Sequence, residues 1–295
     1  MGFGLASYSL LLHLLLVMCA QDSEEDNIIR LPGSNSEIHT DHDHGHLGTT
    51  GTEHLHSHQP SHINMMMHHI NPSEMRFFTM EDMFVGKTMP VYFRRKEPSN
   101  SRLFLPRHKA DSIPFSLKEL PQLLQYFSIS PDSPQAKSME GTLRQCDNKP
   151  ITGEVKLCAT SLESMLDFNR GVFGLDSAFS VVTTTYFSDS NVSFQNYTIL
   201  KVPKEILASK MVACHSLPYS YAVFYCHSQK SENKVYKVSL SGDNGDRIEA
   251  VAVCHMDTSQ WSRNHASFRV LGIEPGTSPV CHFFPADNLI WVDSI

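Results

Sequence analysis

The stretch CHSLPYSYAVFYCH, residues 214–227, carries the feature on which the fold of this 295-residue chain depends. It begins and ends with the dipeptide Cys-His, and the same dipeptide returns twice further along the chain. The four copies are Cys214-His215, Cys226-His227, Cys254-His255 and Cys281-His282, with 10, 26 and 25 residues between successive copies. Every cysteine after Cys158 is therefore followed by a histidine, which chance does not readily produce.

Strand-like sequence surrounds these dipeptides. Residues 221–226 and 235–240 are rich in β-branched and aromatic side chains, and the tetrapeptide at 243–246, Asp-Asn-Gly-Asp, separates two such runs as a hairpin turn does. Successive side chains of an extended strand point to opposite faces. A Cys-His dipeptide in a strand therefore places its sulfur on one face and its imidazole on the other. We expect disulfides on one face and gathered histidines on the other.

Three interpretations of the dipeptides compete. A zinc module needs closely spaced thiolate ligands in a reducing compartment, and neither condition holds here. A purely structural interpretation assigns the sulfurs to disulfides and leaves the histidines without a role, although all four directly follow a cysteine. The third interpretation gives the sulfurs to disulfides and the imidazoles to a metal ion. Nitrogen-only ligation suits copper, which also stands highest in the affinity order of the divalent metals.

The N-terminus predicts entry into the secretory pathway. Residues 1–20 contain an apolar core of leucines and end on Cys19-Ala20, as a signal peptide does. A membrane anchor is the alternative, but the apolar run is short for a spanning helix of ~20 residues, and no later segment qualifies. Removal of residues 1–20 leaves an even number of cysteines, which implies disulfides in an oxidising compartment. They are Cys146, Cys158, Cys214, Cys226, Cys254 and Cys281. Their pairing stays open at this level.

Two further features bear on the class of protein. The triplets that begin at Asn191 and Asn196 are acceptor sites for N-glycosylation and agree with the secretory route. The formal net charge is -7, and the largest basic cluster is the triplet at 94–96. Nucleic acid is therefore excluded as a partner, because phosphate binding needs a basic patch. The sequence also contains no hydrolase elbow, zinc-protease motif or phosphate loop.

Residues 21–76 form a polar segment that we expect to be disordered, as a propeptide or linker. Ten of the 17 histidines lie between His39 and His69, where few apolar side chains are available to offset the entropy of ordering. Alternating histidines at 42, 44 and 46 and at 54, 56 and 58 predict weak chelation of copper or zinc. A solvated tail without metal is the alternative.

The start of this segment contains a candidate sorting signal. Residues Asn27, Ile28, Ile29, Arg30, Leu31 and Pro32 resemble the vacuolar signal Asn-Pro-Ile-Arg-Leu-Pro of plant storage-protein and protease propeptides. Ile28 replaces the proline of that signal. The position directly behind the signal peptide is where such a signal works, so the resemblance implies delivery to a vacuole.

Residues 77–295 are expected to form one disulfide-bonded α+β domain that is predominantly β in its C-terminal half. Aromatic and apolar residues return at Phe77-Phe78. Apolar residues at helical spacing predict helices over 114–130 and from 161 to about 172. Runs beyond Phe179, beginning with 180–187, predict strands.

The whole pattern resembles the BURP domain of plants over about residues 77–295. The match rests on the spacing of the Cys-His dipeptides, on Phe77-Phe78 at the start, and on a closing segment with Cys281-His282-Phe283-Phe284-Pro285, Asp287, Asn288 and Trp291. The short N-terminal region is similar to the seed-protein type (unknown seed protein-like), whose members are associated with storage vacuoles, seed development and stress responses. The resemblance implies copper ligation by His215, His227, His255 and His282.

The resemblance also raises the question of enzyme activity. Some BURP proteins are copper-dependent cyclases that crosslink a Tyr or Trp side chain of a core peptide in the same chain. Residues 21–76 contain neither residue, so self-cyclisation is not expected. A cyclase acting on a separate peptide is the alternative to a metal-binding protein associated with vacuolar or cell-wall components. Four rings close to the histidines in sequence are expected to pack in the core: Tyr219, Tyr221, Tyr225 and Trp261.

Overall fold

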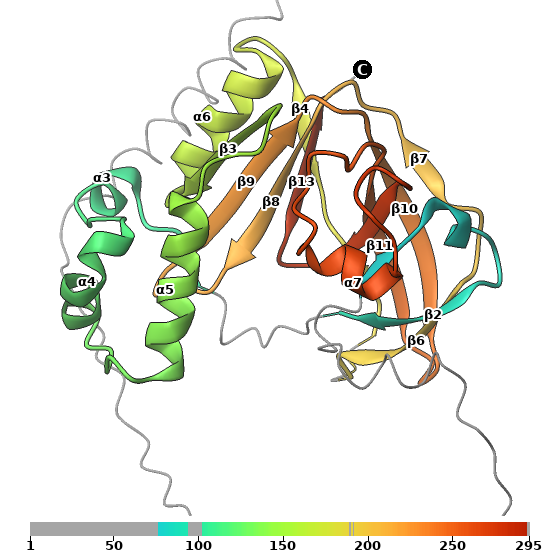
Figure 1. The fold of residues 1–295 in the computed structure, drawn as a ribbon, viewed down its shortest axis with the longest axis horizontal. Coiled ribbons are helices and arrows are strands. Elements are labelled where there is room, and N and C mark those ends of the chain that lie inside the picture. Colours follow the sequence, from blue (N-terminus) through green and yellow to red (C-terminus); the bar gives the residue numbers. More distant parts are fainter. Residues whose placement is uncertain (1–75, 94–101, 189, 191, 294–295) are drawn as a thin grey trace, which may run out of the picture. The chain divides into compact units, whose positions relative to one another are not determined.

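The computed structural model describes residues 76–93, 102–188, 190 and 192–293. Two antiparallel sheets form the centre of this region, and most of its helices lie beside the smaller sheet (Figure 1). The predicted signal peptide, the sorting motif and the histidine-rich segment up to residue 75 lie outside the described residues. Within the described part of the chain, no helix has both the length and the apolar character needed to cross a membrane.

The larger sheet has eight strands and curls around its own core. Along its main path the order is β1 (Phe77–Phe78), β12 (Val280–Phe284), β11 (Arg247–His255), β10 (Asn233–Gly242), β6 (Phe194–Ile199) and β2 (Thr88–Tyr92), with β5 (Thr185–Tyr186) beside β11 and β7 (Lys204–Ile206) beside β10. Phe78 of β1 and Val91 of β2, from the two ends of this order, meet in one buried cluster with Phe283. The sheet therefore closes around these side chains.

The smaller sheet has five strands and is covered on one face by a helix. The order is β3 (Glu154–Ala159), β9 (Val223–Gln229), β8 (Met211–Leu217), β13 (Leu289–Asp293) and β4 (Phe179–Val182). The helix is α6 (Leu162–Phe173), whose Met165 packs against Val212 and Cys214 of the sheet. Ser161 starts this helix by accepting a hydrogen bond from the Ser164 backbone N–H at 3.1 Å.

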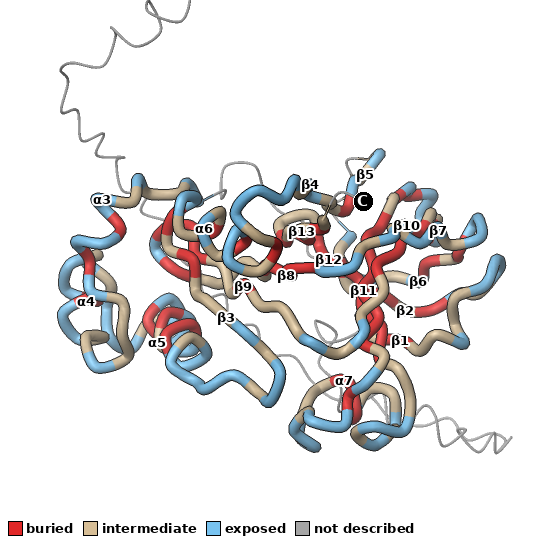
Figure 2. The backbone as a smooth tube through the Cα atoms, turned by 90° about the horizontal axis from the view of Figure 1, so that it is seen from above, coloured by how far each residue is buried: buried red, intermediate tan, exposed pale blue. Residues whose placement is uncertain are grey.

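The two sheets pack face to face through a further buried cluster. It contains Met211, Ala213, Ile290 and Val292 from the smaller sheet and Val235, Val251, Val253 and Phe284 from the larger one. In Figure 2 the buried segments of β8, β13, β12 and β11 run through this central layer. Val253 lies in the layer, whereas its neighbour Cys254 lies in the core of the larger sheet. Strand alternation therefore assigns His255 to the layer between the sheets.

A helical layer packs against the connection between β8 and β9. Its elements are α3 (Arg107–Ala110), the 3₁₀ helix η4 (Leu117–Glu119), α4 (Leu120–Tyr126) and α5 (Pro134–Asp147). Leu123 of α4 and Leu143 of α5 share a buried cluster with Tyr219 and Tyr221. A disulfide between Cys146 and Cys158 joins the end of α5 to β3. The remaining helices are η2 (Met80–Asp82) and α7 (Ala266–Leu271).

The predicted mixture of helix and strand is confirmed, with strands predominating in the C-terminal part. The helix expected from 161 to about 172 is α6. The helix expected over 114–130 is shorter, because η4 and α4 span only 117–126 and Ser128 adopts a positive φ of 55° soon after. Helix α5 was not predicted, since its sequence is largely polar and one of its four buried side chains is Thr142.

The strand expected over 180–187 was wrong in one respect, because the chain there passes from one sheet to the other. Residues 179–182 form β4 of the smaller sheet, and 185–186 form β5 of the larger one. The buried Thr184 makes the crossing: its hydroxyl donates to the carbonyl of Phe284 and accepts from the Val251 backbone N–H at 2.9 Å. The turn expected at 243–246 joins β10 to β11, with Gly245 at a φ of +87°.

Candidate metal centre

Each sheet carries one disulfide between neighbouring strands. Cys214 of β8 lies opposite Cys226 of β9, and Cys254 of β11 lies opposite Cys281 of β12. The paired Cα atoms are 4.0 Å and 3.9 Å apart. Together with the Cys146–Cys158 bridge, these bonds account for all six predicted cysteines. The pairing that the sequence left open is thus three pairs of successive cysteines.

The histidine after each of these four cysteines projects from the opposite face, into the layer between the sheets. The Nε2 atoms of His215 and His227 are 3.3 Å apart, and those of His255 and His282 are also 3.3 Å apart. The ring centroids of His215 and His282 are separated by 6.1 Å, and Phe284 stacks on both rings. The structure therefore brings the four predicted histidines together, as two pairs from two sheets.

Burial and neighbouring charges lower the pKa of three of these imidazoles, those of His215, His255 and His282. His255 is 3% exposed and His282 is 8% exposed. Burial lowers the pKa of His255 to about 3, with smaller contributions from His227 and His265. The pKa of His282 lies well below its usual range, first through burial and then through neighbouring histidines and Arg76. Burial, His227 and Arg76 depress the pKa of His215 in the same way. Neutral imidazole is the form that binds metals.

A buried carboxylate supports the pair on the smaller sheet. Glu154 Oε1 of β3 lies 3.0 Å from His227 Nδ1 and accepts a hydrogen bond from the Tyr225 hydroxyl at 3.3 Å. The contact with His227 has ion-pair distance without ideal hydrogen-bond alignment. Burial alone would raise the pKa of Glu154, but the contact with His227, the Ile151 backbone N–H and Tyr225 together lower it. Glu154 is therefore an anion beside this histidine.

Two asparagines contact the outer nitrogens of His255 and His215. Asn233 Oδ1 at the start of β10 lies 2.7 Å from His255 Nδ1. Asn288, buried in the turn between β12 and β13, places its Nδ2 atom 3.2 Å from His215 Nδ1. Metal-binding histidines generally donate from the outer ring nitrogen to a carboxylate or carbonyl group, as His255 can to the Asn233 oxygen; the Asn288 amide nitrogen offers His215 a donor instead. The sequence pattern contained no signal for Glu154, Asn233 or the role of Asn288.

The donor set fits a metal ion in chemistry and in spacing within each pair. An imidazole nitrogen lies ~2.0–2.1 Å from a bound zinc ion, so two nitrogens on a tetrahedral ion are roughly 3.3 Å apart. Both facing pairs have this separation. However, the described residues contain no group of three or more His, Cys, Asp or Glu side chains already arranged around one point. Binding by more than one pair would require the rings to rotate.

An open cleft of about 900 Å³ leads to the histidines. His215, His227, His255 and His282 line it together with Arg76, Phe77, Lys149, Glu154, Lys156, Trp261, His265 and Asp287. Lys156 extends over the ring of Tyr225 at 5.3 Å and donates to the carbonyl of Gln145 at 3.0 Å. The cluster is therefore accessible to a ligand larger than an ion.

The four aromatic side chains near the histidines divide into two groups. Tyr219 and Tyr221 are buried against the helical layer, as expected for core residues. Tyr225 and Trp261 instead line the cleft, each with its ring about 5 Å from a histidine: 5.1 Å to His227 for Tyr225 and 4.9 Å to His255 for Trp261. The prediction of core packing was wrong for these two, because strand alternation turns Tyr225 to the same face as His227.

A fifth histidine in the cleft was not found from the sequence, because no cysteine precedes it. His265 lies 4.6 Å from Trp261 between ring centroids and caps helix α7 by accepting from the Ser267 backbone N–H at 3.3 Å. Burial lowers its pKa to about 4, with a smaller contribution from Arg76.

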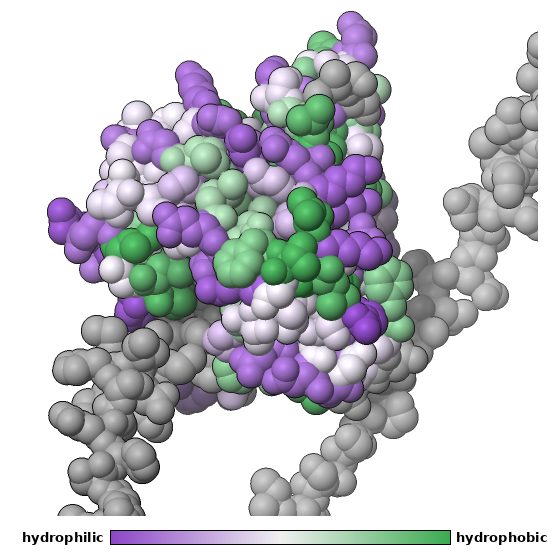
Figure 3. All heavy atoms as spheres, turned by 90° about the vertical axis from the view of Figure 1, so that its right-hand side faces the viewer, coloured by the Kyte–Doolittle hydropathy of each residue, from purple (hydrophilic) through white to green (hydrophobic). Residues whose placement is uncertain are grey.

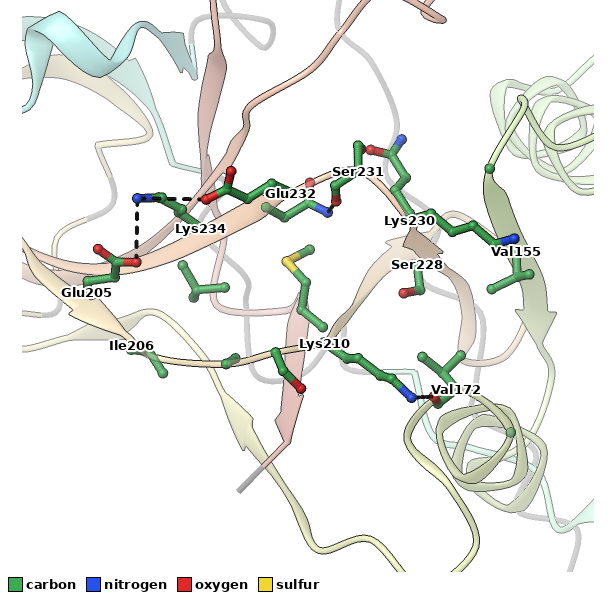
Figure 4. A pocket seen from close by; sticks show the side chains of 18 residues that line it. Val155, Val172, Glu205, Ile206, Lys210, Ser228, Lys230, Ser231, Glu232 and Lys234 are labelled. Atoms are coloured by element: carbon green, nitrogen blue, oxygen red, sulfur yellow. Dashed lines mark hydrogen bonds and ion pairs between the residues drawn. The ribbon is translucent and has the colours of Figure 1, made fainter. Parts of the chain in front are cut away.

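A second cavity, of about 530 Å³, lies between the sheets around the connection from β9 to β10 (Figure 4). Lys234 lies 3.9 Å from both Glu205 and Glu232, and Lys210 donates to the carbonyl of Val172 at 2.9 Å. Lys234 is thus paired with two carboxylates and Lys210 with a backbone carbonyl. The side of the molecule in Figure 3 carries a central group of apolar side chains and smaller apolar groups, with polar side chains between them.

Of the predicted glycosylation and sorting residues, Asn196 alone lies in the described part of the chain. Asn191 lies outside the described residues, as does the sorting motif at 27–32. Asn196 is exposed on β6, where its amide donates to Asp243 at 3.0 Å. Its glycosylation stays a prediction.

A family model described as BURP domain matches residues 76–293. The chain is 45% identical over 227 residues to BURP domain-containing protein BNM2A of Brassica napus, covering 75% of this chain and 80% of that protein. It is 43% identical over 227 residues to BURP domain protein USPL1 of Arabidopsis thaliana, covering 75% and 81%. It is 40% identical over 225 residues to BURP domain protein RD22 of the same plant, covering 76% and 57%.

Proposed function

This chain belongs to the BURP-domain family of plants, and from that premise we propose that it binds copper through His215, His227, His255 and His282. We further propose that it enters the secretory pathway and is delivered to a protein storage vacuole, with the cell wall as the alternative destination. Its role would lie in seed development or in the response to stress. The similarity to USPL1 and RD22 supports the family, and the proposed role goes beyond it.

The observation that carries the copper proposal is the meeting of four imidazoles between two strand pairs, each joined by a disulfide. Each cross-strand disulfide holds its two strands in register, so the following histidines project from one face as a pair. The outer nitrogens of His227 and His255 face the oxygen atoms of Glu154 and Asn233. Such partners orient a ring and raise its basicity as a ligand.

Bound copper would supply one-electron redox chemistry and a strong Lewis acid at the floor of the cleft. Burial would keep His215, His255 and His282 neutral, and Glu154 and Asn233 would hold the outer protons of His227 and His255. The ring of Phe284 stacks on His215 and His282, with 4.8 Å and 4.6 Å between ring centroids.

Metal analysis of the disulfide-intact full chain tests the proposal. We expect the double variant His227→Ala/His255→Ala to lose most of its tightly bound copper after dialysis. The matched control is His42→Ala/His44→Ala, which removes two histidines of the upstream segment. Loss of copper in the control, with full occupancy in the cluster variant, would move the site to that segment.

An alternative function, favoured by the open cleft, is oxidative cyclisation of a separate peptide. The cleft admits a peptide side chain, and Tyr225 and Trp261 border the histidines. The reaction would remove two hydrogen atoms from a Tyr- or Trp-containing peptide and form one bond, while dioxygen is reduced to hydrogen peroxide. Copper-loaded protein in air should then lower the mass of the peptide by ~2 Da, from the two hydrogens. Unchanged masses across a broad peptide library would contradict this activity.

The proposed destination has its own test. Replacement of Ile29 by a polar residue should divert the protein from the vacuole to the cell exterior. Microscopy of a tagged chain would show its destination. Continued vacuolar delivery would place the signal elsewhere. A shift in gel mobility after removal of N-linked sugars would test Asn191 and Asn196 as acceptors.

A further inference from the structure

The two histidine pairs each contain a single hydrogen bond between facing nitrogens. At 3.3 Å, one Nε2 atom must carry a hydrogen and the other must offer a lone pair. A neutral imidazole has one N–H, on either Nδ1 or Nε2. The partner of the outer nitrogen therefore decides which ring in each pair presents a lone pair to the cluster.

On the larger sheet, Asn233 makes this decision for His255. The Asn233 Nδ2 group donates to the carbonyl of Ser231 at 2.8 Å, which fixes the orientation of the amide. Its Oδ1 atom then faces His255 Nδ1 at 2.7 Å and accepts a hydrogen bond from it. His255 is therefore protonated on Nδ1, and its Nε2 lone pair points to His282.

On the smaller sheet, Asn288 imposes the opposite arrangement on His215. The backbone N–H of Ser216 can only donate, and it donates to Asn288 Oδ1 at 3.0 Å. The Nδ2 group of the same amide then faces His215 Nδ1 at 3.2 Å as a donor. His215 Nδ1 must accept, so the proton of this ring is on Nε2.

The rest of the smaller-sheet chain agrees with this assignment. With its proton on Nε2, His215 donates to His227 Nε2, which must then be a lone pair. The proton of His227 lies on Nδ1, where the Glu154 carboxylate is 3.0 Å away. The turn that carries Asn288 is held in place, because the Asn288 N–H donates to Pro285 and the hydroxyl of Ser216 donates to Asp287.

We propose that Asn288 is a positioning residue that holds His215 in the Nε2-protonated tautomer, and that its amide must turn before His215 can bind a metal through Nε2. The tautomer of His215 concerns the metal-free protein alone, whereas the requirement that the amide turn rests on the proposed function. His227 and His255 present lone pairs to the cluster without any change, so they are the ligands that a metal meets first.

The opposition of Asn288 to metal binding follows from the hydrogen count. Moving the proton of His215 from Nε2 to Nδ1 would set an N–H against the Nδ2 group of Asn288. Turning the amide relieves that clash but places a donor against the Ser216 N–H. A carboxylate at position 288 removes the conflict, because its oxygens accept from both groups.

Nitrogen-15 NMR of the histidine rings in the metal-free, disulfide-intact full chain tests the tautomer directly. We expect His215 to be protonated on Nε2 and His255 on Nδ1. Each ring is assigned by the disappearance of its signals in the corresponding His→Gln variant. Asn288→Asp should move the proton of His215 to Nδ1, with a hydrogen then on the facing Nε2 atom of His227. A wild-type His215 protonated on Nδ1 would overturn the proposal, as would an unchanged tautomer in Asn288→Asp.

Copper titration of the same proteins tests the consequence, with Asn233→Asp as the matched control. Both substitutions add one negative charge beside a cluster histidine, but only Asn288→Asp reverses a tautomer, because position 233 already accepts from its ring. Outer partners change metal affinity by about 10- to 100-fold, so we expect at least a tenfold tighter cupric-ion affinity for Asn288→Asp. Equal tightening in both variants would reduce the effect to charge and overturn the positioning role.

The two measurements separate failure of this inference from failure of the proposed function. Predicted tautomers combined with no copper bound in any variant would contradict the copper proposal and leave Asn288 as the group that sets the tautomer of His215. Copper bound at the cluster, with His215 already protonated on Nδ1, would support the copper proposal and contradict the positioning role of Asn288.

Discussion

The strand pair β8–β9 of the smaller sheet and the strand pair β11–β12 of the larger sheet use the same device in different surroundings. Each has a cross-strand disulfide on its outer face and a facing pair of histidines on its inner face. The bridge on the smaller sheet closes 12 residues of chain, and the bridge on the larger sheet closes 27. The covalent bond thus fixes where the rings lie in both cases.

The surroundings of the two pairs differ in charge and in burial. The smaller-sheet pair has the carboxylate of Glu154 beside it, whereas the larger-sheet pair has the neutral amide of Asn233 and the ring of Trp261. The histidines of the larger sheet are also the more deeply buried pair. The disulfides therefore fix the positions of the rings, while their tautomers depend on side chains from β3, from β10 and from the turn between β12 and β13.

Acid should have the largest effect on the stability of the two histidine pairs. The pKa of His255 falls from 6.5 to about 3 on folding, and the pKa values of His215 and His282 also fall. Between pH 6.5 and pH 3, these histidines bind more protons in the unfolded chain than in the folded one. Their contribution to stability is therefore fully present above pH 6.5 and is lost as the pH falls toward 3. His255 alone accounts for a loss of the order of 5 kcal/mol by pH 3.

Urea denaturation of the metal-free protein at several pH values between 7.5 and 3.5 would measure this loss. The glutamate beside His227 works in the same direction, because its pKa is lowered and its contribution also disappears on acidification. Replacement of His255 by Gln should flatten the profile between pH 6.5 and 4. A wild-type midpoint that stays constant over that interval would contradict the assignment of these rings as buried and neutral.

Removal of the disulfides should have the next largest effect, and it should differ between the two sheets. Loop-closure entropy predicts a loss of about 3 kcal/mol for Cys214→Ala/Cys226→Ala and about 3.5 kcal/mol for Cys254→Ala/Cys281→Ala, because the second bridge closes the longer segment. Guanidinium unfolding of both double variants measures the losses. The opposite order would show that the surroundings of the bridges outweigh their loop lengths.

The smallest effects should come from the groups that contact the outer nitrogens. Glu154→Gln should lower the unfolding free energy by about 1.5 kcal/mol, because a bond to a charged group is lost from a buried site. Asn233→Ala should cost about 1 kcal/mol, since the bond it removes is between neutral groups. Both losses can be compared in urea at pH 7.5. A larger loss at position 233 would mean that the charge of Glu154 contributes little.

Part of the centre could be predicted from strand alternation alone. The opposite faces of sulfur and imidazole follow from the period of two in a strand, and Cys254 and His255 lie in different layers as expected. The same rule could have placed Tyr225 on the face of His227, had the strand been continued through both residues. The prediction of core packing for Tyr225 instead weighed the residue type above its position in the strand.

Other parts of the centre required the sheet order. Glu154 lies in β3, and only the pairing of β3 with β9 brings it to His227. Asn288 reaches His215 because the chain passes from β12 of one sheet to β13 of the other through a short turn. Neither contact leaves a local pattern in the sequence, since residues joined by strand pairing are far apart along the chain.

Local chemistry in the sequence by itself determined that six cysteines would form disulfides, that four histidines would project away from four of them, and that strands would predominate in the C-terminal part. These properties depend on neighbouring residues, and backbone geometry relates neighbours directly. Only the tertiary structure decided which cysteines pair, that the two histidine pairs face each other, and which groups contact the outer nitrogens of His215, His227 and His255. Those properties depend on how two sheets pack, which is set by buried side chains from the whole described chain.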